Sequence, residues 1–402
     1  MKRIINIIGL LLCICLLGCV QTSVKEVEQS SVPEVEEIVL WSYYETEEQK
    51  QGLDELVLGF NRSQDKYYMR WEYQGPATEF NKRLAIGITD NQLPDIVIVD
   101  NPDMRQYIEQ EIFEDITEEI EKFEDLNQYY ANVLSSVVYD GRYYGFPFCC
   151  NNVGLIYNKD IFNETGFKIP ETWEEFIEVA VALSNEDRYG FAMSSIAGEQ
   201  GAFQMLPWIL SAGDDLDTLG GDGTVEAFEL IQTLIQNQAL SKESLNWSQN
   251  DVAKKFIAGE SAMMENGPWV FPELNEAGIN YGVAKLPIKN REMSVAGGEN
   301  FGILRGKNIE GAIAFIRYYI EDENMLNVNL RTNSLPPKKA LAEQILNVKP
   351  EQRIFVEQME QCISRASYAG WAEAREYLSD IQLKIITEQI EPEEIPDMFK
   401  VN

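Results

Sequence analysis

The feature that most restricts the fold is an alternation of short apolar runs with amphipathic segments early in the chain. The runs Ile38–Trp41, Tyr67–Trp71 and Asp95–Val99 are rich in strand-forming residues. Between them, residues 47–60 and 80–88 place apolar side chains at helical spacing. The third run is almost continuously apolar, as a parallel strand buried on both faces is. This order predicts a βαβαβ unit and an α/β fold.

A second set of the same signals follows later in the sequence. Val153–Tyr157 is typical of a strand, and Thr172–Glu175 has the pattern of a capping box that opens a helix to about residue 183. Residues 224–238 and 309–320 are amphipathic. We therefore expect two lobes, each a mainly parallel sheet flanked by helices. Ligands of such sheets bind beyond the carboxyl ends of the strands, which predicts one cleft between the lobes.

The composition excludes several classes of function. The chain has 402 residues, with 66 Asp and Glu against 33 Lys and Arg, and its formal net charge is −33. Such a surface repels phosphate backbones, so we expect no nucleic acid partner. Histidine is absent, which removes Ser-His-Asp and Cys-His catalysis and histidine metal sites. The sequence Gly306-Lys307-Asn308 lacks the rest of a P-loop. We therefore expect that the protein is not an enzyme and that it holds no cofactor and no metal.

The first residues predict the cellular location. A basic start is followed by the apolar run Ile4–Leu17, which indicates a secretory signal and is short for a membrane span. Leu16–Cys19 resembles a bacterial lipobox, in which Cys19 is diacylated and becomes the new N-terminus. We therefore expect a lipoprotein signal peptide at 1–18 and a polar, flexible tether at 19–37. The alternative is an uncleaved anchor. Both place the protein on the extracytoplasmic face of the membrane.

Two local patterns leave alternatives open. Asp215, Asp217, Gly220 and Glu226 match four positions of an EF-hand loop, but Leu219 stands where an oxygen ligand is needed. A solvated acidic loop is therefore preferred over a calcium site.

Cysteines occur at positions 13, 15, 19, 149, 150 and 362. The last three cannot make a disulfide framework. Cys149 and Cys150 are adjacent, so they form either a strained bridge or, as we prefer, two small apolar side chains on an extended segment.

Two tryptophans stand at turns and not within apolar stripes. Trp269 follows Gly267-Pro268, and Trp371 follows Gly370. An aromatic ring held on a turn can stack on the C–H face of a sugar, whose hydroxyl groups need carboxylate and amide partners. Packing in the core is the alternative for each ring.

Several motifs, in order, resemble those of one family. The chain is similar to the extracellular solute-binding proteins of the maltodextrin-binding type, which serve sugar ABC importers. The similarity extends from about Ile38 to the C-terminal helices. The matching segments are Leu93–Val97, Gly141–Pro147, Leu155–Phe162, Pro170–Phe176, Ala262–Trp269, Gly297-Gly298, Ala314–Ile316 and Leu335-Pro336.

The resemblance implies a two-lobed, type II periplasmic-binding-protein-like fold whose central cleft closes by hinge motion. The first lobe would contain residues 38–147 and about 295–332, and the second 148–294 and about 333–402. The chain would cross between lobes near Phe148–Asn152, Val295 and Thr332. The family also implies a monomer that binds a small solute and a permease.

The resemblance also implies a set of ligand-binding residues. Trp269 and Trp371 match stacking tryptophans, and Glu199 and Phe203 fall in a loop that supplies an acid and an aromatic. Pro102-Asp103-Met104 lacks the aromatic and basic pair of maltodextrin binders, which argues against maltose itself. The complete set is Glu45, Asp100, Asn101, Asn151, Glu199, Phe203, Trp269, Gly298, Glu299, Trp371 and Arg375.

The expected function is therefore capture of a mono- or oligosaccharide and its delivery to an ABC-type importer. Three alternatives stay open at this point. An extracellular glycoside hydrolase would use paired carboxylates, whose separation the sequence does not give. A surface adhesin would not close on small sugars. A binding protein for a cationic solute, such as a polyamine, would suit the acidic surface.

Overall fold

The computed structural model describes residues 35–90 and 92–399. The expected signal peptide at 1–18, Cys19 and most of the expected tether lie outside the described residues. Within the described ranges, no helix is both long enough and apolar enough to cross a membrane.

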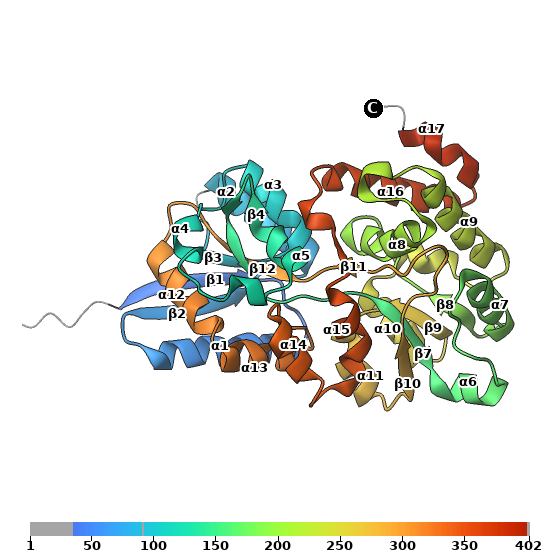
Figure 1. The fold of residues 1–402 in the computed structure, drawn as a ribbon, viewed down its shortest axis with the longest axis horizontal. Helices are drawn as coiled ribbons and strands as arrows, with labels where there is room; N and C mark the ends of the chain where they lie inside the picture. The colour runs from blue at the N-terminus through green and yellow to red at the C-terminus, as the bar shows by residue number, and fades with distance from the viewer. Residues whose placement is uncertain (1–34, 91, 400–402) are drawn as a thin grey trace, which may run out of the picture. The chain divides into compact units, whose positions relative to one another are not determined.

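The first sheet has five strands in the order β2-β1-β3-β12-β6 (Figure 1). β1 runs parallel to β2 and β3, which confirms the predicted βαβαβ unit. β12 arrives from far along the sequence and pairs antiparallel with β3 and β6. The bounds are β1 Glu36–Ser42, β2 Tyr67–Tyr73, β3 Ile96–Asp100, β6 Gly145–Pro147 and β12 Glu299–Ile303. β1 therefore begins within the last part of the expected tether.

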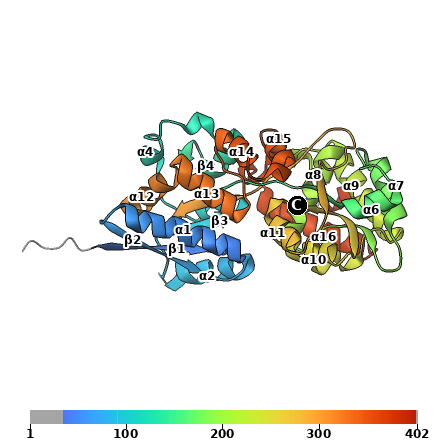
Figure 2. The same cartoon turned by 90° about the horizontal axis from the view of Figure 1, so that it is seen from below.

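Helices α1 (Glu47–Ser63) and α2 (Ala77–Asp90) lie on opposite faces of this sheet (Figure 2). Ile96 and Ile98 of β3 join the hydrophobic cluster that contains the apolar side chains of α1. Val97 and Val99 join the cluster that contains those of α2. Side chains alternate along a strand, so a strand buried on both faces must be apolar at every position.

The second sheet has four strands in the order β10-β7-β9-β8. β7 pairs antiparallel with both β9 and β10, and only β8 and β9 are parallel. β8, β9 and β10 therefore run in the same direction, and β7 is the one strand of this sheet that runs against them. β7 enters from β6 of the first sheet and runs against the two strands beside it, and no local pattern encodes that direction. The bounds are β7 Gly154–Asn158, β8 Tyr189–Ala192, β9 Ser261–Asn266 and β10 Tyr281–Ala284.

The remaining helices fill the sequence between and after these strands. Four short strands also form small two-stranded pairs, namely β4 Val138–Tyr139 with β5 Arg142–Tyr143, and β11 Val295–Ala296 with β13 Ile363–Ser364. The helices are α3 Met104–Glu109, α4 Thr117–Ile120, α5 Ala131–Leu134, α6 Lys159–Thr165, α7 Trp173–Leu183, α8 Glu199–Ala212, α9 Asp222–Gln236, α10 Gln249–Ile257, α11 Phe271–Glu276, α12 Ile309–Tyr319, α13 Asp322–Thr332, α14 Lys339–Ile345, α15 Arg353–Met359, α16 Trp371–Ile386 and α17 Ile395–Phe399.

The start of α7 follows the expected cap only in part. The Thr172 side chain accepts from the backbone N–H of Glu175 at 3.3 Å. The Glu175 carboxylate accepts from the backbone N–H of Glu171 at 2.9 Å, and not from that of Thr172. The helix is therefore capped by Thr172 without the reciprocal bond of a full capping box.

Two helix ends differ from the expected ones. α1 continues to Ser63, beyond the expected range 47–60, and the Asn61 side chain bonds the backbone N–H and carbonyl of Met69 in β2. α9 begins at Asp222, and the hydroxyl of Thr224 donates to the carboxylate of Asp214.

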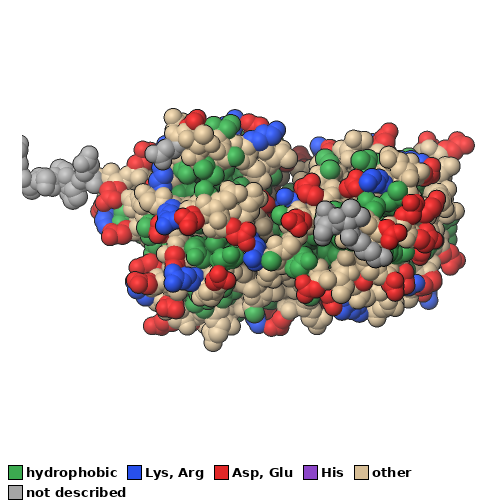
Figure 3. All heavy atoms as spheres, turned by 90° about the horizontal axis from the view of Figure 1, so that it is seen from above, with side chains coloured by type: hydrophobic (Ala, Val, Ile, Leu, Met, Phe, Trp, Pro, Cys, Tyr) green, Lys and Arg blue, Asp and Glu red, His purple; other side chains and the backbone are tan. Residues whose placement is uncertain are grey.

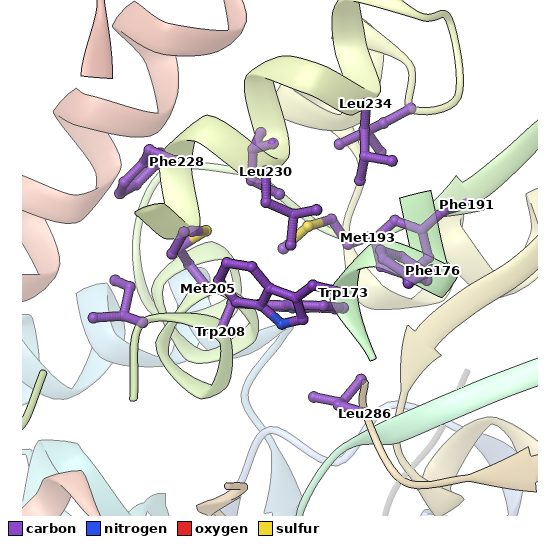
Figure 4. Packing of buried hydrophobic residues seen from close by; sticks show 14 of the residues in the cluster. Trp173, Phe176, Phe191, Met193, Met205, Trp208, Phe228, Leu230, Leu234 and Leu286 are labelled. Atoms are coloured by element: carbon purple, nitrogen blue, oxygen red, sulfur yellow. The ribbon is translucent and has the colours of Figure 1, made fainter. Parts of the chain in front are cut away.

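The core of the second lobe is rich in aromatic side chains (Figure 4). Trp208 of α8 stacks on Phe176 of α7 with ring centroids 5.2 Å apart. Phe191 of β8 meets both rings edge-on. These residues come from two helices and one strand, so their burial fixes the helices against the sheet.

Candidate functional site

Three side chains form the centre of the candidate site. Nε of Arg365 lies 2.5 Å from Oε1 of Glu199, and the indole Nε1 of Trp371 donates to Oε2 of the same carboxylate at 2.9 Å. The Arg365 side chain is 2% exposed. Its guanidinium lies over the ring of Phe203, 4.2 Å from the centroid, and 6.0 Å from that of Trp371. Glu199 is therefore held in one orientation by two donors.

Side chains of the first lobe reach this centre. Nη2 of Arg365 lies 3.7 Å from Oδ1 of Asp100, which ends β3. Nη1 of Arg375 lies 3.5 Å from Asp103 and 3.3 Å from Glu199. The five charged groups thus form one network that joins residues after the first sheet to residues of the second lobe.

Local structure explains why these residues meet. Arg365 directly follows β13, which pairs parallel with β11, and its Nη1 donates to the carbonyl of Ala296 in β11 at 2.6 Å. Trp371 is the first residue of α16, and Arg375 follows one turn later on the same helix. Glu199 is the first residue of α8, where a carboxylate is also favoured by the helix dipole.

Burial raises the pKa of both aspartates in this network. For Asp100, desolvation is the main cause, and Arg365 opposes it. For Asp103, desolvation is again first, followed by the repulsion from Glu199, while Arg375 lowers the pKa. In each aspartate the arginine therefore offsets only part of the rise in pKa that burial causes.

Glu299 forms a second carboxylate centre beside the first. Its carboxylate accepts from the hydroxyls of Tyr43 at 3.0 Å and Tyr44 at 3.2 Å, and from the thiol of Cys149 at 2.6 Å. Burial raises the pKa of Glu299, and these three donors oppose that rise. Because protein groups already donate to both of its oxygens, Glu299 is suited to holding Tyr43 and Tyr44 in place.

Four other expected site residues lie around the connection between the sheets. The backbone N–H of Asn101 donates to the carbonyl of Gly298 at 2.9 Å. The Asn101 side chain is buried, and its Oδ1 has no hydrogen-bond partner among the described residues. Asn151 and Phe203 both face Gly297, since a Cβ placed there would lie 2.3 Å from Oδ1 of Asn151 and 3.2 Å from Phe203.

Trp269 and Glu45 occupy the edge of this region. The ring of Trp269 lies against Gly267, is half-buried, and packs against the hydrophobic cluster that includes Phe203 and Trp371. Glu45 is exposed, and its carboxylate accepts from Nδ2 of Asn250 in α10 at 3.0 Å. The structure thus brings Trp269 toward the aromatic side of the site and Glu45 to the start of α10.

Sequence reasoning missed Arg365, Tyr43 and Tyr44 as functional residues, and noted Asp103 only as a departure from the family. Arg365 stands between a two-residue strand and a short turn, so no periodicity marks it. The usable signal was a lone basic residue within a largely uncharged stretch, Gln361–Gly370. Tyr43 and Tyr44 directly follow β1. Ligands of such sheets bind beyond the carboxyl ends of the strands, so this position could have indicated them.

A groove of about 710 Å³ lies elsewhere, and none of the expected contact residues lines it. It is bordered by α1 and α13 and by Pro272, Asn275 and the segment from Val348 to Glu351. Its lining is mainly carboxylate, amide and basic side chains, without the aromatic rings of the network described above.

The two patterns left open by the sequence have clear structural roles. Asp215 accepts from Nη2 of Arg291 at 2.6 Å, and the carboxylate of Asp214 accepts from the backbone N–H groups at the start of α9. These contacts agree with the acidic-loop interpretation. Cys149 and Cys150 are free, buried thiols that pack in hydrophobic clusters, as does Cys362.

Comparison with known proteins identifies the family. Residues 55–351 match the model of the bacterial extracellular solute-binding proteins, and the chain belongs to this family. It is 29% identical over 219 residues to the maltotriose-binding protein of Pyrococcus abyssi, covering 52% of this chain and 45% of that protein. It is 23% identical over 330 residues to the galactooligosaccharide-binding protein of Bacillus subtilis, covering 78% of this chain and 76% of that protein. The match thus spans less than half of the Pyrococcus relative.

Solved structures share the fold. An ABC transporter solute-binding protein of Thermotoga lettingae, bound with α-D-tagatose, has a TM-score of 0.82 at 19% identity, over 90% of this chain and 97% of that one. UgpB of Mycobacterium tuberculosis, in complex with glycerophosphocholine, has a TM-score of 0.80 at 17% identity, over 91% of this chain and 97% of that one. The two-lobed α/β fold is therefore confirmed, and the family is one of binding proteins, as the sequence indicates.

Proposed function

We propose that the protein is the carbohydrate-binding subunit of an ABC-type importer. The observation that carries this proposal is the network in which Glu199 is held by Arg365 and Trp371 beside Asp100 and Asp103. Carboxylates fixed next to an aromatic ring match the hydroxyl groups and the C–H face of a sugar. The names of the Pyrococcus and Bacillus relatives, which bind oligosaccharides, support the same class.

The solute enters when the lobes are apart. In the described form the Trp371 side chain is 3% exposed, and arginines of the second lobe contact aspartates that follow β3. A sugar that inserts between these groups keeps contacts with both lobes, and so favours closure. No bond of the sugar changes.

The proposed lobes are residues 38–147 with about 295–332, and 148–294 with about 333–402. This division is supported by the strand pairing, since β6 and β12 belong to the first sheet and β7 to the second. The segment Phe148–Asn152 would act as one hinge strand. The proposed ligand contacts are those expected from the sequence, with Glu299 as the residue that positions Tyr43 and Tyr44.

The proposal includes a lipid anchor at Cys19, after removal of residues 1–18, and a monomer that meets the permease on the outer face of the membrane. The family name supports an extracellular location. Mass spectrometry of the protein from its native membrane tests the anchor, because a diacylated Cys19 as the first residue is expected. An unmodified peptide that spans residues 10–30 would contradict it.

Thermal unfolding of residues 20–402 against maltotriose, galactooligosaccharides, tagatose and spermidine tests the function. A solute that binds only the folded state stabilises it by about 2.7 kcal/mol at a hundredfold excess over Kd. We expect a shift with a sugar, and recovery of that sugar intact. Breakdown of the sugar would indicate a glycoside hydrolase, and a shift with spermidine alone would indicate a cation-binding protein.

A pair of variants links the shift to the site. Trp371→Ala removes the ring and the donor to Glu199, so we expect it to abolish the sugar shift. Tyr68→Ala removes an exposed aromatic from β2, at 54% exposure, and is the matched control. Equal loss in both variants would contradict the assignment of the site.

A further inference from the structure

The two arginines of the network are already bound to carboxylates of the protein. Arg365 donates to Glu199 and to the carbonyl of Ala296, lies near Asp100, and has its faces next to Phe203 and Trp371. With 2% of its side chain exposed, it offers no free edge to a solute.

Arg375 is more accessible, with 21% of its side chain exposed, but it is also engaged. Nη1 lies between Asp103 at 3.5 Å and Glu199 at 3.3 Å, and Nε is 3.8 Å from Glu376. Asp103 is held from the other side by Nδ2 of Asn81 at 3.3 Å. Asp103 therefore shares Nη1 of Arg375 with Glu199, and Nε is buried without a hydrogen-bond partner among the described residues, so Nη1 is the atom for which an anionic ligand would compete with Asp103.

Carboxylates outnumber the arginines in the same region. Asp100, Asp103, Glu199 and Glu299 stand against Arg365 and Arg375. Burial raises the pKa of Tyr43, and the nearby charges of Glu299 and Asp100 raise it further. A phosphate or carboxylate that entered here would be desolvated beside these acids and would have to displace one of them from its arginine. A hydroxyl group can instead donate to a carboxylate oxygen.

We infer that this site selects uncharged solutes and rejects phosphorylated or carboxylated ones, and that Asp103 is a specificity-determining residue that withholds Arg375 from anions. The inference rests on the proposed function, since it takes this network as the solute site. The fold itself does not decide whether a phosphorylated solute is bound, because a protein solved with glycerophosphocholine has the same fold.

The test compares anionic with neutral probes on three proteins. Calorimetry with sn-glycerol 3-phosphate and glucose 6-phosphate, next to glucose and maltotriose, is applied to the wild type, Asp103→Asn and Asp65→Asn. Asp65 is exposed between α1 and β2, so its variant removes one negative charge outside the network. We expect no anion binding by the wild type or Asp65→Asn, and a gain of at least about tenfold in anion affinity in Asp103→Asn.

The double variant Asp103→Asn/Arg375→Gln shows whether Arg375 is the group released. It should lose the gained anion affinity, while its unfolding midpoint reports whether it is folded. Anion binding by the wild type as tight as that of the neutral probes would overturn the inference and leave the proposed function standing. Failure of Asp103→Asn to gain anion affinity would also overturn it.

Failure of the proposed function gives a different result. If the neutral sugars do not bind the wild type while Asp103→Asn still gains anion affinity through Arg375, the sugar proposal is wrong and the assignment of Asp103 holds.

Discussion

At the scale of single residues, one buried guanidinium organises the candidate site. Arg365 orients Glu199, reaches Asp100 and lies against the ring of Phe203, although no periodicity in its local sequence marks it. A planar fork with five donors can hold two carboxylates and a carbonyl at fixed angles, which a lysine cannot. The geometry of the candidate site therefore depends on a residue whose partners are protein groups, while its neighbours are the proposed contacts of the solute.

We predict that Arg365→Gln lowers the free energy of unfolding by about 3–5 kcal/mol, because it removes the buried positive charge that pairs with Glu199 and Asp100. Arg365→Lys keeps the charge and should have an intermediate effect, with weakened sugar binding. Arg353→Lys, in an exposed pair with Glu357, is the control and should change neither quantity. Urea unfolding measures the stability, and calorimetry measures the sugar binding. Unchanged stability in Arg365→Gln would contradict the buried network.

A second residue-scale prediction concerns Glu265 in β9. Its side chain is fully buried, Trp208 donates to one of its oxygens at 2.7 Å, and the other oxygen has no hydrogen-bond partner among the described residues. Burial raises the pKa of Glu265 well above the ordinary value of 4.5, and the Trp208 bond opposes this. The folded state therefore keeps the proton at pH values where the unfolded chain has lost it.

The direction in which stability changes with pH follows from this difference in pKa between the folded and the unfolded state. The stability that comes from the protonated form is complete below 4.5 and decreases as the pH rises toward the folded pKa. Glu265→Gln still accepts from Trp208 but does not titrate. We predict that its unfolding midpoint exceeds that of the wild type more at about pH 8 than at about pH 5. A constant difference across this range would show that Glu265 has no raised pKa.

At the scale of elements, close approach between segments decides what the site region tolerates. Gly298 connects β11 with β12 at a φ of +119°, and a Cβ there would lie 2.3 Å from the carbonyl oxygen of Cys149. Gly166, after α6, also has a positive φ of +75°, but a Cβ there meets nothing within 4 Å. Both glycines have a positive φ, which disfavours any residue with a Cβ, but only at Gly298 would the Cβ also clash with a neighbouring backbone.

We predict that Gly166→Ala costs about 1 kcal/mol of stability, from backbone strain alone. Gly298→Ala should cost clearly more, since its Cβ would also clash with the backbone of Cys149 and Cys150. The midpoints of urea unfolding measure both costs. If the two variants lose equal stability, the close approach at Gly298 does not hold.

At the scale of the whole molecule, the acidic surface acts on both stability and partners. Figure 3 shows Asp and Glu side chains spread over the face in view, with fewer basic ones between them. The chain as a whole carries a formal net charge of −33. Repulsion among like charges weakens a compact state, and salt screens it over a Debye length of about 10 Å at 0.1 M.

We predict that raising NaCl from about 0.02 to about 0.5 M increases the unfolding midpoint of the wild type. Potassium chloride should act equally, since screening does not depend on the cation. A midpoint that falls with salt would mean that the surface ion pairs outweigh the repulsion.

The sequence by itself determined the local structure and much of the composition of the site. Alternating apolar and amphipathic segments specify strands and helices because side-chain periodicity is a local property, so β1 to β3, α1 and α2 were predictable. Trp371, Glu199 and Arg375 were expected from the family resemblance, and the structure brings their side chains together. The tertiary structure alone decided the antiparallel course of β7, the half-formed cap at Thr172, and the role of Arg365. Strand direction and burial of a charge depend on partners distant in the sequence, and no local pattern contains them.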